Sequence, residues 1–295
     1  MPKKIKNLYV LPFDHRSSFY SKLLGFKKPL DKKEAREVQN YKKIVFNGFK
    51  KAYSSYSPKN ELAVLIDEEF GKDIIKECRK RKINFALTTE KSGQEFFQFE
   101  YAGNFKKHLK KIKPNFAKAL VRYNPAYKKE NTEQRKKIKL LYNFCRQNKI
   151  KLIIELLIPP TDGELKRVGT KKNFDYKLRP ELLIKSMREF HKDKIFPDIW
   201  KLEAMERKTD WLKLFKILSK KEKVIVLGRG ENKKQVKEWL KIAAPFSKNI
   251  GFAVGRTVFF KPLKKYRDGE IKKVKATSLI ADNFKELIKL WEENT

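Results

Sequence analysis

The sequence predicts an α/β fold, a single (β/α)8 barrel of the TIM-barrel type that spans residues 1–295. Two patterns carry this prediction: eight short apolar runs recur along the chain, and segments with the spacing of amphipathic helices separate them. The length of 295 residues agrees, because such barrels typically have about 250 residues or somewhat more. No low-complexity segment or linker interrupts the alternation, so we expect one domain.

The eight apolar runs are the predicted strands. Parallel strands are covered on both faces, and they therefore appear in a sequence as nearly continuous apolar segments. In chain order the runs are LYVLPFD (8–14), LAVLID (62–67), INFALTTE (83–90), FAKALVRY (116–123), LIIELLI (152–158), DIWKLEAM (198–205), KVIVLGRG (223–230) and IGFAVGRT (250–257).

Helical spacing fills most of the intervals between these runs. Apolar residues recur there every three or four positions, which places them on one face of a helix. A final helix would close the outer ring of the barrel. The predicted helical segments lie within residues 34–56, 71–81, 132–148, 180–193, 211–221, 232–244 and 278–294.

The composition indicates a packed globular protein. Hydrophobic residues make up 40% of the chain and aromatic residues 13%, which is ample for a core. The sequence has no apolar run of the roughly 20 residues that a membrane span needs, so we expect a soluble cytoplasmic protein with no membrane partner. Cys78 and Cys145 are isolated, and their spacing indicates neither a disulfide framework nor a zinc site.

The formal net charge of +37 raises the possibility of a nucleic-acid-binding protein. However, the basic residues are spread along the chain, mostly on predicted helix faces, and Lys far outnumbers Arg. Solvated helix faces in a lysine-rich protein give the same picture. We therefore expect no specific nucleic-acid partner, and we leave assembly into a homo-oligomer open.

One lysine lies in the middle of a predicted buried strand. Lys201 is flanked by apolar residues in FPDIWKLEAM (196–205), and strand alternation places it on the same face as Glu203. Lys118 and Arg122 share a face of another strand in the same way. Because unpaired charge is costly to bury, these groups must form either a paired structural network or a catalytic site at the carboxyl ends of the strands.

Two lysines and a carboxylate could carry out Schiff-base chemistry. A lysine in a low-dielectric pocket beside another cation has a lowered pKa, and its neutral amine can attack a carbonyl group. Lys201 would be this nucleophile, Lys118 the neighbouring cation, and Glu155 the acid and base that moves protons.

Glycine and arginine follow the last two predicted strands. LGRGE supplies Gly228, Arg229 and Gly230, and VGRT supplies Gly255 and Arg256. Barrels often bind a substrate phosphate at these two loops, where glycine allows close approach of backbone N–H groups. A glycine-rich turn without a ligand is the alternative, but both motifs occur at the expected places.

The ordered blocks LPFDHR, IDEEFG, TEKSGQEFFQFEY, KALVRYNP, IELLIPP, LRPELL, PDIWKLE, VLGRGE and IGFAVGRT carry a resemblance that covers nearly the whole chain. It resembles the aldolase-type domain of bacterial inositol catabolism, which follows a sugar kinase and is assigned to 2-deoxy-5-keto-gluconate 6-phosphate cleavage. More distantly, it is similar to the metal-free class I tagatose-1,6-bisphosphate aldolases. Because the family's substrate assignment depends partly on the fused kinase, the resemblance indicates the mechanism more firmly than the substrate.

The resemblance implies a role for individual residues. The Schiff-base lysine falls on Lys201, the glutamate of the fifth strand on Glu155, and the lysine of the fourth strand on Lys118. The aspartate of the first strand, which handles substrate hydroxyls and protons, falls on Asp14, and the phosphate-binding arginine falls on Arg256. The turn at 228–230 would supply backbone N–H groups to the same phosphate.

Several other polar residues are weaker candidates for substrate contacts. They are His15, which is more often structural at such a place, the loop residues Glu90, Lys91 and Ser92, and Arg122 and Asn124 for a second phosphate or a carboxylate. Asp67 and Glu68 have no partner with metal-ligand spacing, and His108 and His191 lie in helical segments, so we expect no metal and no cofactor. The predicted partner is a phosphorylated sugar, and a barrel that binds it without turnover is the main alternative to an aldolase.

Overall fold

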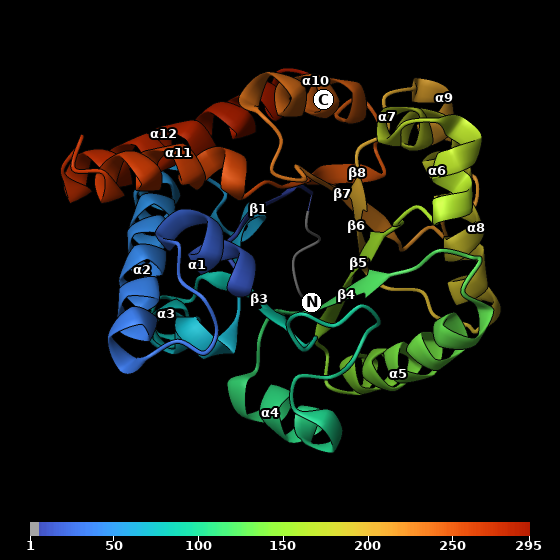
Figure 1. Cartoon of the computed structure of the whole chain (residues 1–295), viewed down its shortest axis with the longest axis horizontal. Coiled ribbons are helices and arrows are strands. Elements are labelled where there is room, and N and C mark those ends of the chain that lie inside the picture. The colour runs from blue at the N-terminus through green and yellow to red at the C-terminus, as the bar shows by residue number, and fades with distance from the viewer. Residues whose placement is uncertain (1–5) are drawn as a thin grey trace.

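The computed structural model describes residues 6–295 as a closed barrel of eight parallel strands that pair in chain order. Figure 1 looks along the barrel and shows the helices outside the strands. This confirms the predicted (β/α)8 barrel. The strands are β1 (Leu8–Pro12), β2 (Leu62–Ile66), β3 (Asn84–Thr88), β4 (Phe116–Arg122), β5 (Lys151–Leu157), β6 (Ile199–Glu203), β7 (Lys223–Leu227) and β8 (Asn249–Ala253).

The outer layer consists of helices, several of them long and amphipathic. Within residues 6–295 no helix is both long enough and apolar enough to cross a membrane. The α-helices are α1 (Ser17–Leu24), α2 (Lys32–Ser55), α3 (Glu68–Arg81), α4 (Phe105–Ile112), α5 (Lys128–Gln147), α6 (Asp162–Val168), α7 (Lys171–Asn173), α8 (Arg179–Lys192), α9 (Lys208–Phe215), α10 (Lys233–Ala243), α11 (Arg256–Arg267) and α12 (Lys273–Glu292). The 3-10 helices η1 (Lys59–Glu61) and η2 (Ala102–Asn104) and the π-helix η3 (Phe174–Leu178) complete the set.

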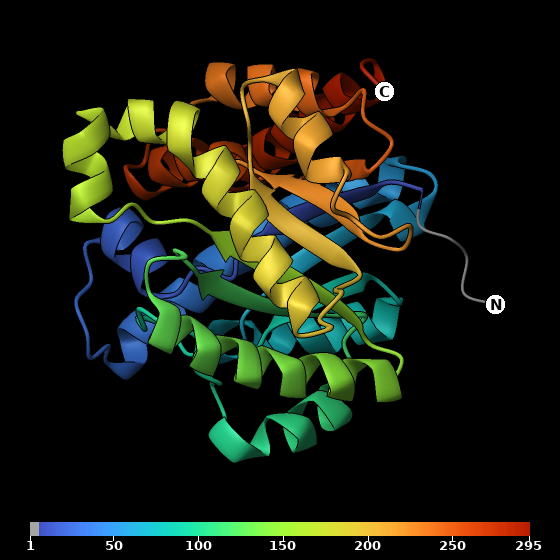
Figure 2. The same cartoon turned by 90° about the vertical axis from the view of Figure 1, so that its right-hand side faces the viewer.

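The structure differs from the sequence prediction in two respects, the ends of the strands and the set of helices. Most strands end two to four residues earlier than the apolar runs do, because the chain turns into a loop where the run acquires glycine or charge, as at β7 and β8. In addition, α1, α11 and the stretch from α6 through η3 were not among the predicted helices. In Figure 2, α6 lies on the side of the molecule opposite the N-terminus, which is the side of the strand carboxyl ends.

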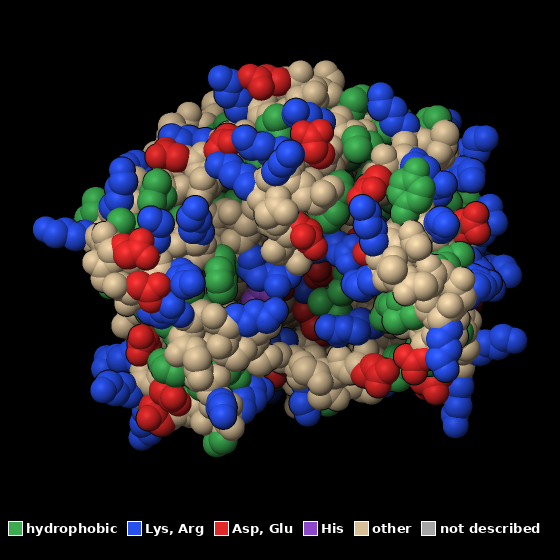
Figure 3. Space-filling view, turned by 45° about the horizontal axis from the view of Figure 1, so that its top comes forward, with side chains coloured by type: hydrophobic (Ala, Val, Ile, Leu, Met, Phe, Trp, Pro, Cys, Tyr) green, Lys and Arg blue, Asp and Glu red, His purple; other side chains and the backbone are tan. Residues whose placement is uncertain are grey.

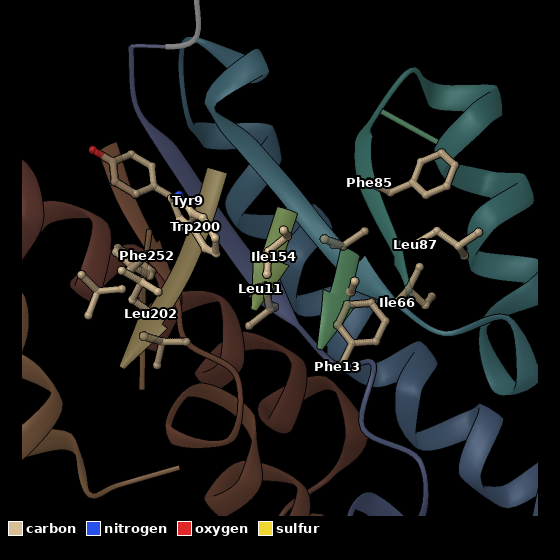
Figure 4. Close-up of a cluster of buried hydrophobic side chains, with 14 of the residues drawn as sticks. Tyr9, Leu11, Phe13, Ile66, Phe85, Leu87, Ile154, Trp200, Leu202 and Phe252 are labelled. Carbon is tan, nitrogen blue, oxygen red and sulfur yellow. The ribbon is translucent and has the colours of Figure 1, made fainter. Parts of the chain in front are cut away.

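The strands separate two cores. Side chains that point outward pack beneath the helices, and Figure 4 draws some of them, with Trp200 and Leu202 among those it labels. Side chains that point inward fill the barrel, most of them below its mouth and Ala253 at the mouth itself; they are Leu8, Val10, Ala63, Leu65, Ala86, Phe116, Ile153, Ile199, Ile225, Ile250 and Ala253.

This inner core determines which residues reach the barrel mouth. Residues two apart on a strand share a face, so the inward position after Phe116 is Lys118, the one after Ile153 is Glu155, and the one after Ile199 is Lys201. The apolar plug therefore supports a layer of charged side chains directly above it.

Candidate active site

A single carboxylate bridges the two lysines at the mouth. The strand register places Glu155 beside Lys201, and Glu155 Oε1 lies 2.8 Å from Lys201 Nζ. The other oxygen, Oε2, lies 2.8 Å from Lys118 Nζ. All three residues are buried. The structure thus brings together the three residues that the sequence singled out for Schiff-base chemistry.

Lys118 also contacts two further carboxylates. Its Nζ lies 3.0 Å from Asp14 Oδ2 and 2.6 Å from Glu90 Oε1. Glu90 was a candidate for sugar hydroxyls, but one of its oxygens is used by Lys118 and the other accepts backbone N–H groups from Thr89 and Leu120. Three carboxylates offset the charge of Lys118, so its field at Lys201 is weaker than the sequence suggested.

The ion pairs also decide the protonation of the cluster. Burial alone would raise the pKa of Glu155, but the ammonium groups of Lys118 and Lys201 outweigh burial and lower it to about 2. The same two cations hold the pKa of Asp14 below its usual range against burial. For Lys118 burial favours the neutral form, yet Asp14, Glu155 and Glu90 raise its pKa well above the ordinary value. Glu155 and Asp14 are therefore ionised, and Lys118 is protonated, at neutral pH.

His15 lies in the wall of the mouth pocket. Burial lowers the pKa of its imidazole to about 4, and the nearby cations Arg256 and Lys201 act in the same direction against Asp14. Its Nδ1 has no hydrogen-bond partner within residues 6–295, and 28% of the side chain is exposed. The His15 side chain thus lines the pocket with an imidazole that burial keeps neutral, while its buried Nδ1 lies 3.9 Å from Asp14 Oδ1.

The pocket above the cluster has a volume of about 330 Å³. Its wall includes Glu155 and Lys201 together with residues of the loops after β7 and β8. In Figure 3 basic, acidic and histidine side chains gather in a hollow near the centre of the face that is shown. All five predicted phosphate-binding residues after β7 and β8 line this pocket, and so does Arg122 at the end of β4; the five are Gly228, Arg229, Gly230, Gly255 and Arg256.

Arg256 and the turn at 228–230 are in direct contact. The Arg256 guanidinium donates a hydrogen bond of 2.6 Å to the carbonyl oxygen of Arg229. A Cβ atom at Gly230, whose φ is +79°, would lie 2.4 Å from Arg256 Cζ. The positive φ thus favours glycine at 230, and any side chain there would displace the Arg256 guanidinium from its present place.

Arg229 lines the pocket too, but its guanidinium is already paired. Its Nε lies 3.2 Å from Glu203 Oε1, and its Nη1 lies 2.7 Å from Asp175 Oδ2. Asp175 belongs to η3 and also binds Arg179 at 3.1 Å. No sequence signal indicated this network, because it joins the ends of β6 and β7 to a helical segment that the apolar pattern did not reveal.

The remaining candidates lie outside the pocket wall. Ser92 and Lys91 are in the loop after β3, and Asn124 donates hydrogen bonds to the carbonyl oxygen of Pro159 in a loop and to Glu164 Oε2 in α6. Asp67 caps α3 and pairs with the fully buried Lys42. Within residues 6–295 no group of three or more His, Cys, Asp or Glu residues is arranged to hold a metal ion.

The sequence profile of the DUF2090 family, described as an uncharacterized protein conserved in bacteria, matches residues 1–295. The chain belongs to the DUF2090 family. No curated protein matches it in sequence. Several solved structures share the fold of this DUF2090 protein, all at low sequence identity.

One solved relative in fold is Cgl0159 from Corynebacterium glutamicum, with 14% identity, a TM-score of 0.62, and coverage of 98% of this chain and 87% of that chain. An archaeal fructose 1,6-bisphosphate aldolase has 10% identity and a TM-score of 0.58, with coverage of 96% and 95%. A Schiff-base-forming fructose-1,6-bisphosphate aldolase has 11% identity and a TM-score of 0.54, with coverage of 94% of each chain. At these identities the likeness shows the barrel fold.

Proposed function

We propose that this protein is a class I aldolase, a lyase that cleaves or forms a carbon–carbon bond in a phosphorylated ketose or keto sugar acid. The observation that carries the proposal is the contact of 2.8 Å between Lys201 Nζ and Glu155 Oε1 at the base of the mouth pocket. A barrel that only binds sugar phosphates needs neither a buried nucleophile nor a proton acceptor beside it. The fold shared with a Schiff-base-forming aldolase also supports the proposal.

The proposed reaction begins with proton transfer from Lys201 Nζ to Glu155 Oε1. The neutral amine attacks the ketone carbon, and the carbinolamine loses water, with the proton supplied by Glu155, to give an iminium ion. A carboxylate at the mouth then removes the proton from the substrate hydroxyl. The electron pair of the carbon–carbon bond moves into the iminium, so that an aldehyde leaves and an enamine remains. Protonation and hydrolysis of the enamine release the second product and restore Lys201.

Asp14 and Lys118 support this sequence of steps. Lys118 holds one oxygen of Glu155, which leaves the other oxygen directed at Lys201. Asp14 Oδ2 lies 3.0 Å from Lys118 Nζ. The resemblance to class I aldolases implies that Asp14 takes the proton of the substrate hydroxyl. The charged cluster is thus prepositioned before substrate arrives, which lowers the cost of reorganisation during the reaction.

Two cations at opposite sides of the mouth suit a substrate with two anionic ends. Arg122 ends β4 and Arg256 follows β8, and these strands lie opposite each other in an eight-stranded barrel. Neither guanidinium has a carboxylate within 4.0 Å among residues 6–295, whereas Arg229 has two. We infer that Arg256 with the turn at 228–230 binds one phosphate and that Arg122 binds a second phosphate or a carboxylate. Within this class, 2-deoxy-5-keto-gluconate 6-phosphate and ketose bisphosphates are the substrates we favour.

The first prediction concerns the covalent intermediate. Borohydride added together with tagatose 1,6-bisphosphate, fructose 1,6-bisphosphate or 2-deoxy-5-keto-gluconate 6-phosphate should reduce the iminium and fix one adduct on Lys201, as peptide mapping by mass spectrometry would show. Treatment with EDTA should leave cleavage unchanged. An adduct on Lys118 would exchange the roles of the two lysines. Tight binding of these ligands without adduct or turnover would support a sugar-phosphate-binding barrel instead.

A further inference from the structure

A second and larger cavity lies outside the barrel, beside the mouth. It is a groove of about 980 Å³ between α11 and α12 that extends to the start of α10. Thr257, Lys261 and Lys265 form one wall along α11, and Lys275, Leu279 and Asn283 form the other along α12, each set at intervals of four residues. Its size is at the upper end of the range for small-molecule sites. We refer to it as the α11–α12 groove.

The groove carries an excess of unpaired positive charge. Six cations line it, and two of these are paired, Lys233 with Glu286 and Lys265 with Glu270. Four have no carboxylate within 4.0 Å among residues 6–295, and the lining has one carboxylate, Glu231. The unpaired cations are Lys22, Arg256, Lys261 and Lys275.

The floor of the groove is apolar. Phe260 and Ile271 are half-buried, and both pack against the main core, while the half-buried Leu279 adds a third apolar side chain. Inorganic phosphate or a sugar phosphate would leave this floor exposed to water. A fatty acid would cover the floor but would satisfy few of the cations. A ligand that combines several negative charges with an apolar, flat ring matches both features.

We propose that the α11–α12 groove binds a nucleoside polyphosphate. Its phosphate groups lie on Lys261, Lys275 and Arg256, and its base covers Phe260. Arg256 and Gly230 belong to the walls of both the groove and the mouth pocket. A bound nucleotide would therefore act on the residues to which we assign the substrate phosphate, and this consequence, unlike binding itself, rests on the proposed function.

Direct titration with ATP in the absence of metal tests the proposal without any need for catalysis. Binding should be measured by calorimetry at about 0.15 M salt, where exposed charges are largely screened. Adenosine should not bind measurably, and tripolyphosphate should bind about tenfold or more weakly than ATP. The variant with Lys261→Glu and Lys275→Glu should weaken ATP binding by about tenfold or more for each lost contact. Both lysines are exposed, and Lys275→Glu puts a negative charge in the first turn of α12, where it favours the helix.

Two controls separate a specific site from the attraction of any polyanion to this basic protein. Lys110→Glu with Lys111→Glu on α4 makes the same charge change at exposed lysines and should leave ATP affinity within about twofold. Phe260→Ala should weaken ATP but not tripolyphosphate. The proposal is overturned if the α4 variant weakens ATP as much as the groove variant does, or if ATP and tripolyphosphate bind equally and Phe260→Ala changes neither.

Discussion

At the residue scale, Glu155 is the side chain whose charge the proposed chemistry needs most. Glu155→Gln keeps the shape of the side chain and one acceptor oxygen for Lys118 or Lys201, but its amide NH2 group cannot accept a hydrogen bond from the second ammonium, and the variant cannot transfer protons. We predict a loss of about 10²–10⁴ in kcat with a much smaller change in KM, as is typical for removal of a general acid and base. Steady-state kinetics with the substrate that gives the Lys201 adduct measures both values.

Asp14→Asn is the matched variant for this prediction, because it removes one carboxylate from Lys118 without touching Lys201. If Asp14 handles the hydroxyl proton, its loss also lowers kcat, yet the borohydride adduct on Lys201 should still form. With Glu155→Gln the adduct itself should form slowly. Equal adduct rates in the two variants would contradict the separate roles given to these carboxylates.

Strand alternation explains which side chains of the site were predictable. Lys118, Glu155 and Lys201 lie inside regular strands, so their inward direction follows from the period of two and the apolar residues before them. The contact of Glu90 with Lys118 was not predictable, because Glu90 follows the end of β3 and its direction depends on the loop. The same holds for Arg229, whose φ of +53° directs its side chain towards Glu203.

At the scale of elements, the loops after β7 and β8 carry two arginines with different surroundings. Arg256 has no carboxylate partner among residues 6–295, and its contact is a carbonyl oxygen, whereas Arg229 is paired with Glu203 and Asp175. Arg256→Ala should raise KM for a phosphorylated substrate about tenfold or more, because the loss of the charged contact removes about 1.5–3 kcal/mol of binding free energy. The melting temperature should change little.

Arg229→Ala is the comparison for the Arg256 variant. It leaves the largely buried Glu203 with a distant partner, Arg179 at 4.0 Å, so it should lower the free energy of unfolding by about 1–3 kcal/mol. Denaturant titration and steady-state kinetics on both variants test the contrast. An Arg256 variant that unfolds more easily while binding substrate phosphate normally would show that the two roles are reversed.

Three of the elements that the sequence failed to predict share a physical cause. Helices α6, α7 and η3 are short, with three to seven residues each, and α6 and α7 contribute no buried side chain. Without an apolar face, such helices leave no periodic signal. Their boundaries come instead from caps, such as Thr161 with Glu164, and from tertiary ion pairs, such as Asp175 with Arg229.

At the scale of the whole molecule, the fold was predictable because eight apolar runs and the helical intervals repeat the same unit. The closed barrel then brings Asp14, which follows β1, and residues of β4, β5 and β6 to one mouth, although Asp14 and Lys201 are 187 positions apart along the chain. The positive charge is different, because it is spread over the face that Figure 3 shows and along the whole sequence, and it follows from lysine-rich helices rather than from the barrel. The α11–α12 groove is the one cluster of positive charge to which we assign a function.

The buried charges also determine how the stability of the molecule depends on pH. The pKa of His15 falls from 6.5 to about 4 on folding, chiefly because of burial, so the unfolded chain binds more protons than the folded chain between these values. The pKa values of Glu155 and Asp14 are also lowered on folding, so their contribution to stability is lost as the pH falls below their ordinary values near 4. All three groups act in the same direction. We therefore predict that the melting temperature falls steadily as the pH is lowered from about 6.5 to about 4, and more steeply below 4.

His15→Asn separates the histidine from the carboxylates. It removes the titration between pH 6.5 and 4 and leaves the Lys118 cluster in place, so the melting temperature of the variant should be nearly constant over that window and should fall only at lower pH. Differential scanning calorimetry at constant ionic strength measures both profiles, and constant salt is needed because a net charge of +37 makes the repulsion within the molecule depend on screening. Parallel profiles for the variant and the unmodified protein above pH 4 would show that folding does not lower the pKa of His15. The neutral imidazole inferred for the pocket would then be wrong.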